Sequence, residues 1–145
     1  MRVTRKRLIG TGAIAAVSLV SAGVGVSVAA SGTTTHTLTF TSIQLTAHGV
    51  GKTSFVNTAK DVKNGKFIGN NVVDGHFDNT TKTAVLSIAA AFKGGFIFAQ
   101  ADVNSHGVFS HGKVTGGTRA YKGITGTLDI TSVSAKTKNI TITYH

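Results

Sequence analysis

The chain has 145 residues, 15 of them basic and five acidic, so its formal net charge is +10. It has no cysteine, which excludes disulfides, thiolate metal sites and cysteine nucleophiles. All five acids are aspartates, so any carboxylate chemistry depends on these few positions.

The first 30 residues have the pattern of a secretory signal peptide. Four basic residues lie within the first seven positions, and residues 8–30 carry no charge and end in "VAA". We expect cleavage after Ala30, or after Ala29, giving a mature domain of residues 31–145 that is secreted and extracellular. A retained membrane anchor is the alternative, because the apolar run is long enough to span a bilayer. Its glycines and serines disfavour that alternative.

Period-two alternation dominates the remainder and predicts an all-β domain. In "ALSIAAAF" one face carries Ala84, Leu86, Ile88, Ala90 and Phe92. Turn signals, of which Asn-Gly in "KNGK" is the strongest, separate such segments. The expected strands are residues 36–47, 53–62, 66–77, 82–92, 95–104, 108–115, 123–133 and 138–144. They predict an eight-stranded antiparallel up-and-down barrel, with a two-sheet sandwich as the alternative.

Two of these segments carry further expectations. The alternation in residues 36–47 changes phase between Phe40 and Ile43, which predicts a β-bulge at Thr41-Ser42. In residues 84–92 the second face is small and uncharged, so another surface could cover it, and the sequence allows a homo-oligomer. Because that segment contains four alanines, a helix is its competing assignment.

The candidate catalytic residues are weakly marked. Alternation places Asp102 on the same face as Phe96, Phe98 and Gln100. If that face is internal, the two rings and the amide would bind ligand and Asp102 would act as an acid with a raised pKa. The other face, starting at Ile97, is an equal alternative. In "DGHFD" His76 shares a face with two aspartates and could do acid–base work, although an outward orientation is favoured because Phe77 belongs in the core.

No motif predicts a cofactor, a metal or a nucleic-acid partner. The stretches "GVGKTSF" and "GVFSHGKV" imitate a phosphate-binding loop, but each lacks one required residue and neither precedes a helical pattern. His106 and His111 are five residues apart and fall on opposite faces of a strand. The lysines are spaced along predicted turns rather than clustered with aromatic residues. We also expect no stable membrane insertion of the mature chain.

The stretch "VTGGTRAYKGITGTL" resembles a signature of the allene oxide cyclase and dirigent barrel superfamily. The matching positions are Gly116, Gly117, Thr118, Tyr121, Gly123 and Gly126. The resemblance implies a barrel that binds a small apolar molecule and guides its cyclisation or coupling, as an isomerase does. Arg119 replaces the last glycine of the family turn, and Ile124-Thr125 replaces its "Ala-Arg". No family glutamate can be carried over, and Asp61 is nearest to the family's acidic position.

On this reading the glycines are structural, serving a tight turn, a strand bend and close backbone approach, while Tyr121 covers the barrel end. The opposing hypothesis is a structural or surface-interaction protein whose barrel is filled by side chains. Small residues on the inward faces distinguish the two hypotheses, because a cavity requires them. The candidates are Ala84, Ala90, Gly69 and Gly75.

Overall fold

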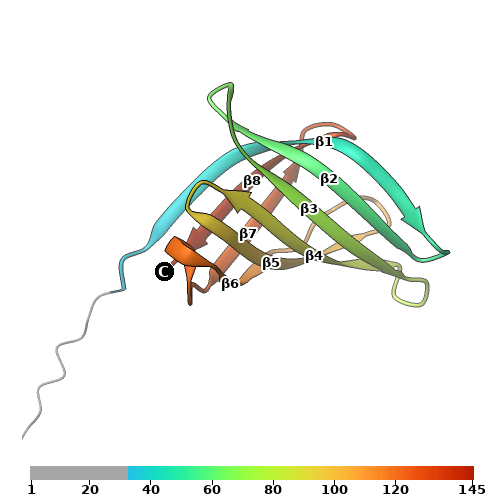
Figure 1. Cartoon of the computed structure of the whole chain (residues 1–145). Helices are drawn as coiled ribbons and strands as arrows, with labels where there is room; N and C mark the ends of the chain where they lie inside the picture. The colour runs from blue at the N-terminus through green and yellow to red at the C-terminus, as the bar shows by residue number, and fades with distance from the viewer. Residues whose placement is uncertain (1–32) are drawn as a thin grey trace, which may run out of the picture. The chain divides into compact units, whose positions relative to one another are not determined.

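The computed structural model describes residues 33–145, and the expected signal peptide lies outside the described residues. Eight strands make up most of this part (Figure 1). They are β1 (His36–Val50), β2 (Ser54–Lys63), β3 (Lys66–Asp78), β4 (Thr83–Phe92), β5 (Gly95–Asn104), β6 (Gly112–Gly117), β7 (Gly126–Ser132) and β8 (Thr137–Tyr144). One short 3-10 helix, η1 (Arg119–Tyr121), follows β6.

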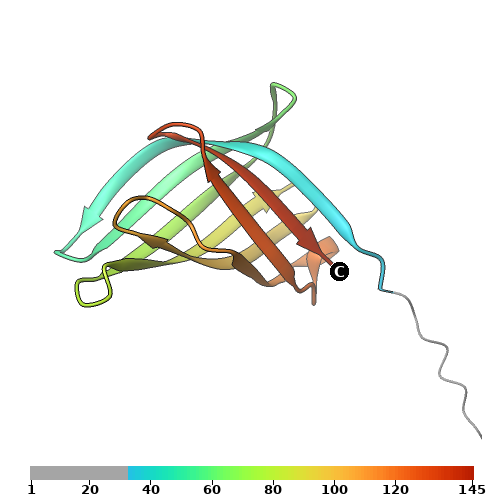
Figure 2. The same cartoon turned by 180° about the vertical axis from the view of Figure 1, so that it is seen from behind.

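The strands form one closed antiparallel barrel in which each pairs with its neighbours along the chain. β1 pairs with β8 and closes the sheet, as the two opposite views show (Figures 1 and 2). The predicted eight-stranded up-and-down barrel is therefore confirmed, and the sandwich and the helix over residues 84–92 are wrong. The largest differences lie at β6 and β7, which begin at Gly112 and Gly126 rather than at residues 108 and 123.

Successive side chains face the interior and the solvent in turn, as strand geometry requires. On β4 the predicted inward face is confirmed, since Ala84, Leu86 and Ala90 are only 2%, 4% and 3% exposed. The bulge predicted at Thr41-Ser42 is wrong. β1 keeps one alternation through Ser42, which is buried, and its register with β2 shifts between Gln44 and Thr46 instead.

Aromatic rings fill one end of the barrel, where β4 and β8 end and β1 begins. Phe92 meets the rings of Phe40 and Tyr121 edge-on, with centroids 5.4 Å and 6.4 Å apart. Tyr121 meets Tyr144 edge-on at 5.9 Å, and His36 stacks on Tyr144 at 5.4 Å. Such pairs add to the stability gained by burying the rings. This end is therefore packed with side chains.

Two glycines of the segment between β6 and β7 permit close backbone approach. A Cβ atom on Gly126 would overlap the carbonyl oxygen of Thr143 on the neighbouring strand β8. A Cβ on Gly117 would lie 2.6 Å from the carbonyl oxygen of Phe96. No side chain fits at either position without moving backbone, so these glycines allow the sheet to close.

The remainder of this segment forms the cap of the packed end. Gly116 and Gly123 have φ angles of 152° and 78°, which favour glycine. Between them η1 carries Tyr121 over the barrel end, as expected from the sequence. Burial, with a further contribution from Tyr144, raises the pKa of the Tyr121 hydroxyl, so this group is neutral at physiological pH.

Candidate functional site

A cavity of about 160 Å³ lies inside the barrel. Its floor is next to the aromatic end, at Phe40 and Ile97, and it extends to the opposite end, where Phe55, Val103 and Phe109 contribute to its lining. An engineered cavity of about 150 Å³ lined by Leu, Ile and Phe holds benzene, so this one matches a body of about one or two rings. The barrel is therefore not filled by its own side chains.

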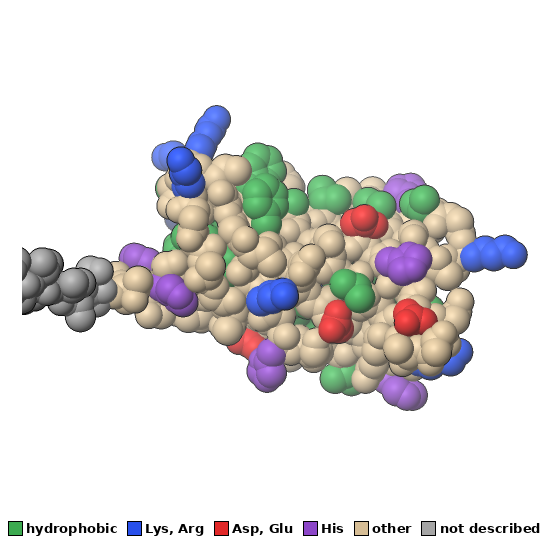
Figure 3. Space-filling model, turned by 90° about the horizontal axis from the view of Figure 1, so that it is seen from below, with side chains coloured by type: hydrophobic (Ala, Val, Ile, Leu, Met, Phe, Trp, Pro, Cys, Tyr) green, Lys and Arg blue, Asp and Glu red, His purple; other side chains and the backbone are tan. Residues whose placement is uncertain are grey.

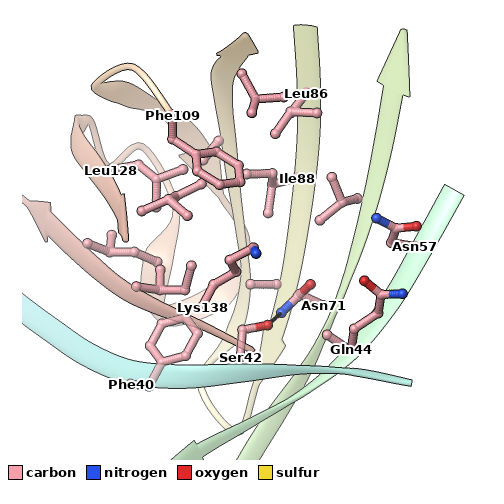
Figure 4. A pocket seen from close by; sticks show the side chains of 18 of the residues that line it. Phe40, Ser42, Gln44, Asn57, Asn71, Leu86, Ile88, Phe109, Leu128 and Lys138 are labelled. Carbon is pink, nitrogen blue, oxygen red and sulfur yellow. Dashed lines mark hydrogen bonds between the residues drawn. The ribbon is translucent and has the colours of Figure 1, made fainter. Parts of the chain in front are cut away.

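The cavity has a polar wall and an apolar wall (Figure 4). Its neutral polar side chains all come from the first three strands: Ser42 and Gln44 on β1, Asn57 on β2 and Asn71 on β3. Strands β4, β5 and β7 line it with apolar side chains only. A ligand in this space would meet hydrogen-bonding groups along one side and hydrocarbon along the other.

Asn71 is held by two hydrogen bonds at the floor of the cavity. Its Nδ2 donates to Asp61 Oδ1 at 2.6 Å and to Ser42 Oγ at 2.8 Å. A carboxylate can only accept, so this arrangement fixes which way the amide points. Both amide hydrogens are thereby used, and the Asn71 Oδ1 remains as an acceptor. Ser42 Oγ accepts from Asn71, and the Ser42 hydroxyl also favours the charged form of Asp61, whose pKa it lowers.

Asp61 lies behind this pair and is the most unusual charged group of the domain. It is 0% exposed, and within residues 33–145 its Oδ2 has no hydrogen-bond partner. Burial raises the pKa of the Asp61 carboxyl to about 6, against the opposing effects of Asn71 and Ser42. A buried carboxyl in that range can hold or release a proton near neutral pH. Asp61 does not line the cavity and reaches a ligand only through Asn71.

Two lysines of the β7–β8 hairpin and β8 complete the lining. Lys138 is partly buried, Lys136 is exposed, and the cavity surface includes both. Lys138 Nζ donates to the carbonyl oxygens of Ser134 at 2.8 Å and Ala135 at 3.4 Å. It also lies 5.9 Å from the ring centroid of Phe109.

The predicted catalytic candidates lie in different places. Of Asp61, Asp102 and His76, only Asp61 is inside the barrel. His76 is exposed on β3, where its Nδ1 lies 3.1 Å from Ser54 Oγ, which agrees with the outward orientation favoured for "DGHFD". Asp102 is exposed on β5, so the interpretation of Asp102 as an internal acid is corrected.

The predicted ligand-binding residues of β5 also face outward. Phe96 and Phe98 are 45% and 39% exposed, and their rings stack on each other with centroids 6.2 Å apart. Gln100 is exposed on the same face. The alternative left open by the sequence holds instead, since Ile97, at 1% exposure, begins the inward face. These three residues do not line the interior cavity.

The four small residues proposed to leave space are all buried, but only one of them lines the cavity. Ala90 does so directly. Gly75 lies under the ring of Phe55, and a Cβ there would overlap this ring. A Cβ on Gly69 would likewise overlap the backbone carbonyl oxygen of Ala91. Gly69 and Gly75 therefore allow close packing of the wall rather than leaving open volume.

The sequence interpretation missed the polar lining. Ser42, Asn71 and Lys138 are polar residues on inward faces, and hydrophobic alternation assigns such residues to the outside. A usable signal was present on β8, where Lys138 continues the inward series of Ile142 and Ile140. On β1, Ser42 continues the series of Leu38 and Phe40 in the same way.

The outer surface carries the other charges. Lys and Arg side chains on the face drawn in Figure 3 lie mostly toward the two ends of the molecule. His111 pairs with Asp129 on the surface, and His106 is exposed in the loop before β6. Within residues 33–145, no three His or Asp side chains are grouped as a metal site. No helix in this same part of the chain is long and apolar enough to cross a membrane.

Comparison with known proteins supports the fold only. No family model matches the chain, and no curated protein matches it. Among solved structures, the chain is similar to one described as pyocyanin demethylase, with a TM-score of 0.66 and 17% identity over 76% of this chain and 100% of that chain. At this identity the similarity establishes a shared β-barrel architecture. The resemblance to the allene oxide cyclase and dirigent superfamily stays a hypothesis.

Proposed function

We propose that the protein is an exported β-barrel that binds a small, largely apolar molecule in its interior. The observation that carries the proposal is the cavity of about 160 Å³, which is packed at one end and has polar groups on one wall. Binding sites for small molecules are commonly concave and mostly apolar, with a few placed polar groups. The similar solved structure is named for an activity on a small molecule, which agrees with this use of the fold.

The polar wall favours a ligand that carries a hydrogen-bond donor, such as a hydroxyl or N–H group. Asn71 offers its amide oxygen because Asp61 and Ser42 take both of its amide hydrogens. Placing an apolar group against that oxygen would leave a buried acceptor without a partner, which costs about 1–3 kcal/mol. The site therefore distinguishes a phenol-like molecule from the corresponding hydrocarbon.

We further propose that the barrel guides cyclisation or coupling of its ligand, as the resemblance to the superfamily implies. Catalysis of this kind requires a shaped cavity and a group that stabilises developing charge. Asn71 and Ser42 would contact the reacting molecule, and Asp61 would hold Asn71 in position. Asp61→Asn should then alter the turnover of a cyclising substrate more than its binding.

The direct test is ligand binding by the mature domain, with 1-naphthol as a two-ring probe that carries one hydroxyl. A ligand that binds only the folded state at a hundred times its Kd stabilises it by about 2.7 kcal/mol, which a thermal melt detects. Ala90→Phe, which places a ring in the cavity, should abolish this shift, whereas Ser87→Phe on the outer face of β4 should not. If 1-naphthol and other one- or two-ring probes leave the melting curve unchanged, the proposal fails and a structural or surface-interaction role becomes the better account.

A further inference from the structure

Two charged side chains inside the barrel lie on either side of strand β1, where Ser42 pairs with Asp61 of β2 and with Lys138 of β8. Asp61 is buried behind Asn71, which lines the cavity. Lys136 and Lys138 contribute to the lining, whereas Asp61 does not. The other four aspartates are absent from the lining, so within the described residues no carboxylate of the cavity surface neutralises these two lysines.

Lys138 retains hydrogen-bonding capacity. An ammonium group has three N–H donors, and the carbonyl oxygens of Ser134 and Ala135 accept two of them. Those acceptors are neutral, so the positive charge of Lys138 is not balanced by either bond. In the close-up, its nitrogen is directed toward the inside of the barrel (Figure 4). One donor and the full charge are available to a ligand.

The position of this ammonium group is fixed by the surrounding backbone. The Gln44 backbone N–H donates to the carbonyl oxygen of Lys136 at 2.8 Å, which ties the β7–β8 hairpin to β1. Within the hairpin the Val133 N–H donates to the Thr137 carbonyl oxygen at 3.0 Å. Lys138 thus extends from a strand whose ends are hydrogen-bonded on both sides, and little ordering is needed when an anion binds.

Building on the proposed function, we infer that the cavity selects an amphipathic anion: an apolar body of one or two rings' size with a carboxylate that pairs with Lys138. Charge fixes the orientation of the ligand in the barrel. The negative group lies at Lys138 and Lys136, because these are the charged side chains of the lining and both are cationic. The apolar body then lies against Leu86, Ile88 and Leu128, which line the other wall.

The test compares two probes that share one body, 1-naphthoate and its neutral amide 1-naphthamide, by calorimetry at low salt on the mature domain. We expect 1-naphthoate to bind about ten- to a hundredfold more tightly than 1-naphthamide, which is the gain in affinity that one charge-assisted hydrogen bond provides. The difference should shrink as salt is added, because the lysines are partly exposed. Lys138→Met should remove the preference by lowering the affinity for 1-naphthoate to about that for 1-naphthamide. Lys138→Arg should retain the preference.

Matched controls separate this inference from the binding proposal itself. Lys60→Met removes the same charge from the outer face of β2 and should leave the preference intact. Equal affinities for the two probes would overturn the anion inference while the apolar-ligand proposal stands. If neither probe binds, and 1-naphthol also fails, both proposals are overturned. If Lys138→Met loses affinity for both probes while remaining folded, the lysine supports the hairpin and the inference is wrong.

Discussion

Replacing Asp61 by Asn should change how the stability of the barrel depends on pH. The carboxyl is fully buried, and burial raises its pKa from 3.8 to about 6. Folding therefore favours the protonated form. This contribution to stability is complete below pH 3.8 and is lost as the pH rises through about 6. At pH 8 the folded barrel has to bury a charged carboxylate, which lowers its stability.

The magnitude follows from the interval between the two pKa values. At 1.36 kcal/mol for each pH unit, the full interval corresponds to about 3 kcal/mol, of which about 2.5 kcal/mol is lost between pH 4 and pH 8 through this carboxyl alone. Asp61→Asn keeps the oxygen that accepts from Asn71 and has no charge to bury. The amide hydrogens that this substitution buries lower the stability of the variant, but by an amount that does not change with pH. The stability difference between variant and wild type should therefore shift by about 2.5 kcal/mol in favour of the variant over this range.

The assay is thermal or urea unfolding of the mature domain, followed by circular dichroism from pH 4 to pH 8. For a domain of this size the shift corresponds to about 10–20 °C in the difference between the two melting temperatures. Asp102→Asn, which removes an exposed carboxyl from the outer face of β5, is the matched control for the loss of one carboxylate. Parallel curves for Asp61→Asn and wild type would refute the reasoning, because the buried group would then not titrate in this range.

Three other predictions concern the fold, the export and the chemistry. Gly126→Val should destabilise the barrel by at least about 2 kcal/mol or prevent folding, because its side chain overlaps the Thr143 carbonyl oxygen, whereas Gly49→Val, with open space around it, should be tolerated in the same melt. N-terminal sequencing of the exported protein should begin near Ser31, and an intact Met1 in a membrane fraction would instead indicate an anchor. Asn71→Ala should weaken the binding of 1-naphthol about tenfold or more and that of naphthalene little, as fluorescence titration of the two probes can measure. Equal losses for both probes would mean that Asn71 supports the wall and does not contact the hydroxyl.

The position of the site was less accessible from the sequence than the barrel around it. Only its place in a family pattern marks Asp61 as a candidate, and nothing in the local sequence indicates that it is buried. By sequence alone, Asp102 and the rings of Phe96 and Phe98 are equally good candidates, because only the orientation of β5 in the barrel excludes them from the interior. Alternation divides a strand into two faces but does not say which face is internal when both are apolar, as in "GFIFAQADV".

The sequence by itself determined the architecture. Period-two alternation, Asn-Gly and glycine turns, and eight segments of similar length are local properties, and they specify antiparallel strands joined in order. Only the tertiary structure decided the site. Asn71 meets Asp61, ten residues away on the neighbouring strand, and Ser42, 29 residues away. Lys138 comes next to Ser42 only because β8 pairs with β1 and closes the barrel. Whether these residues face one another depends on register and closure, which involve all eight strands and are not encoded in any short stretch.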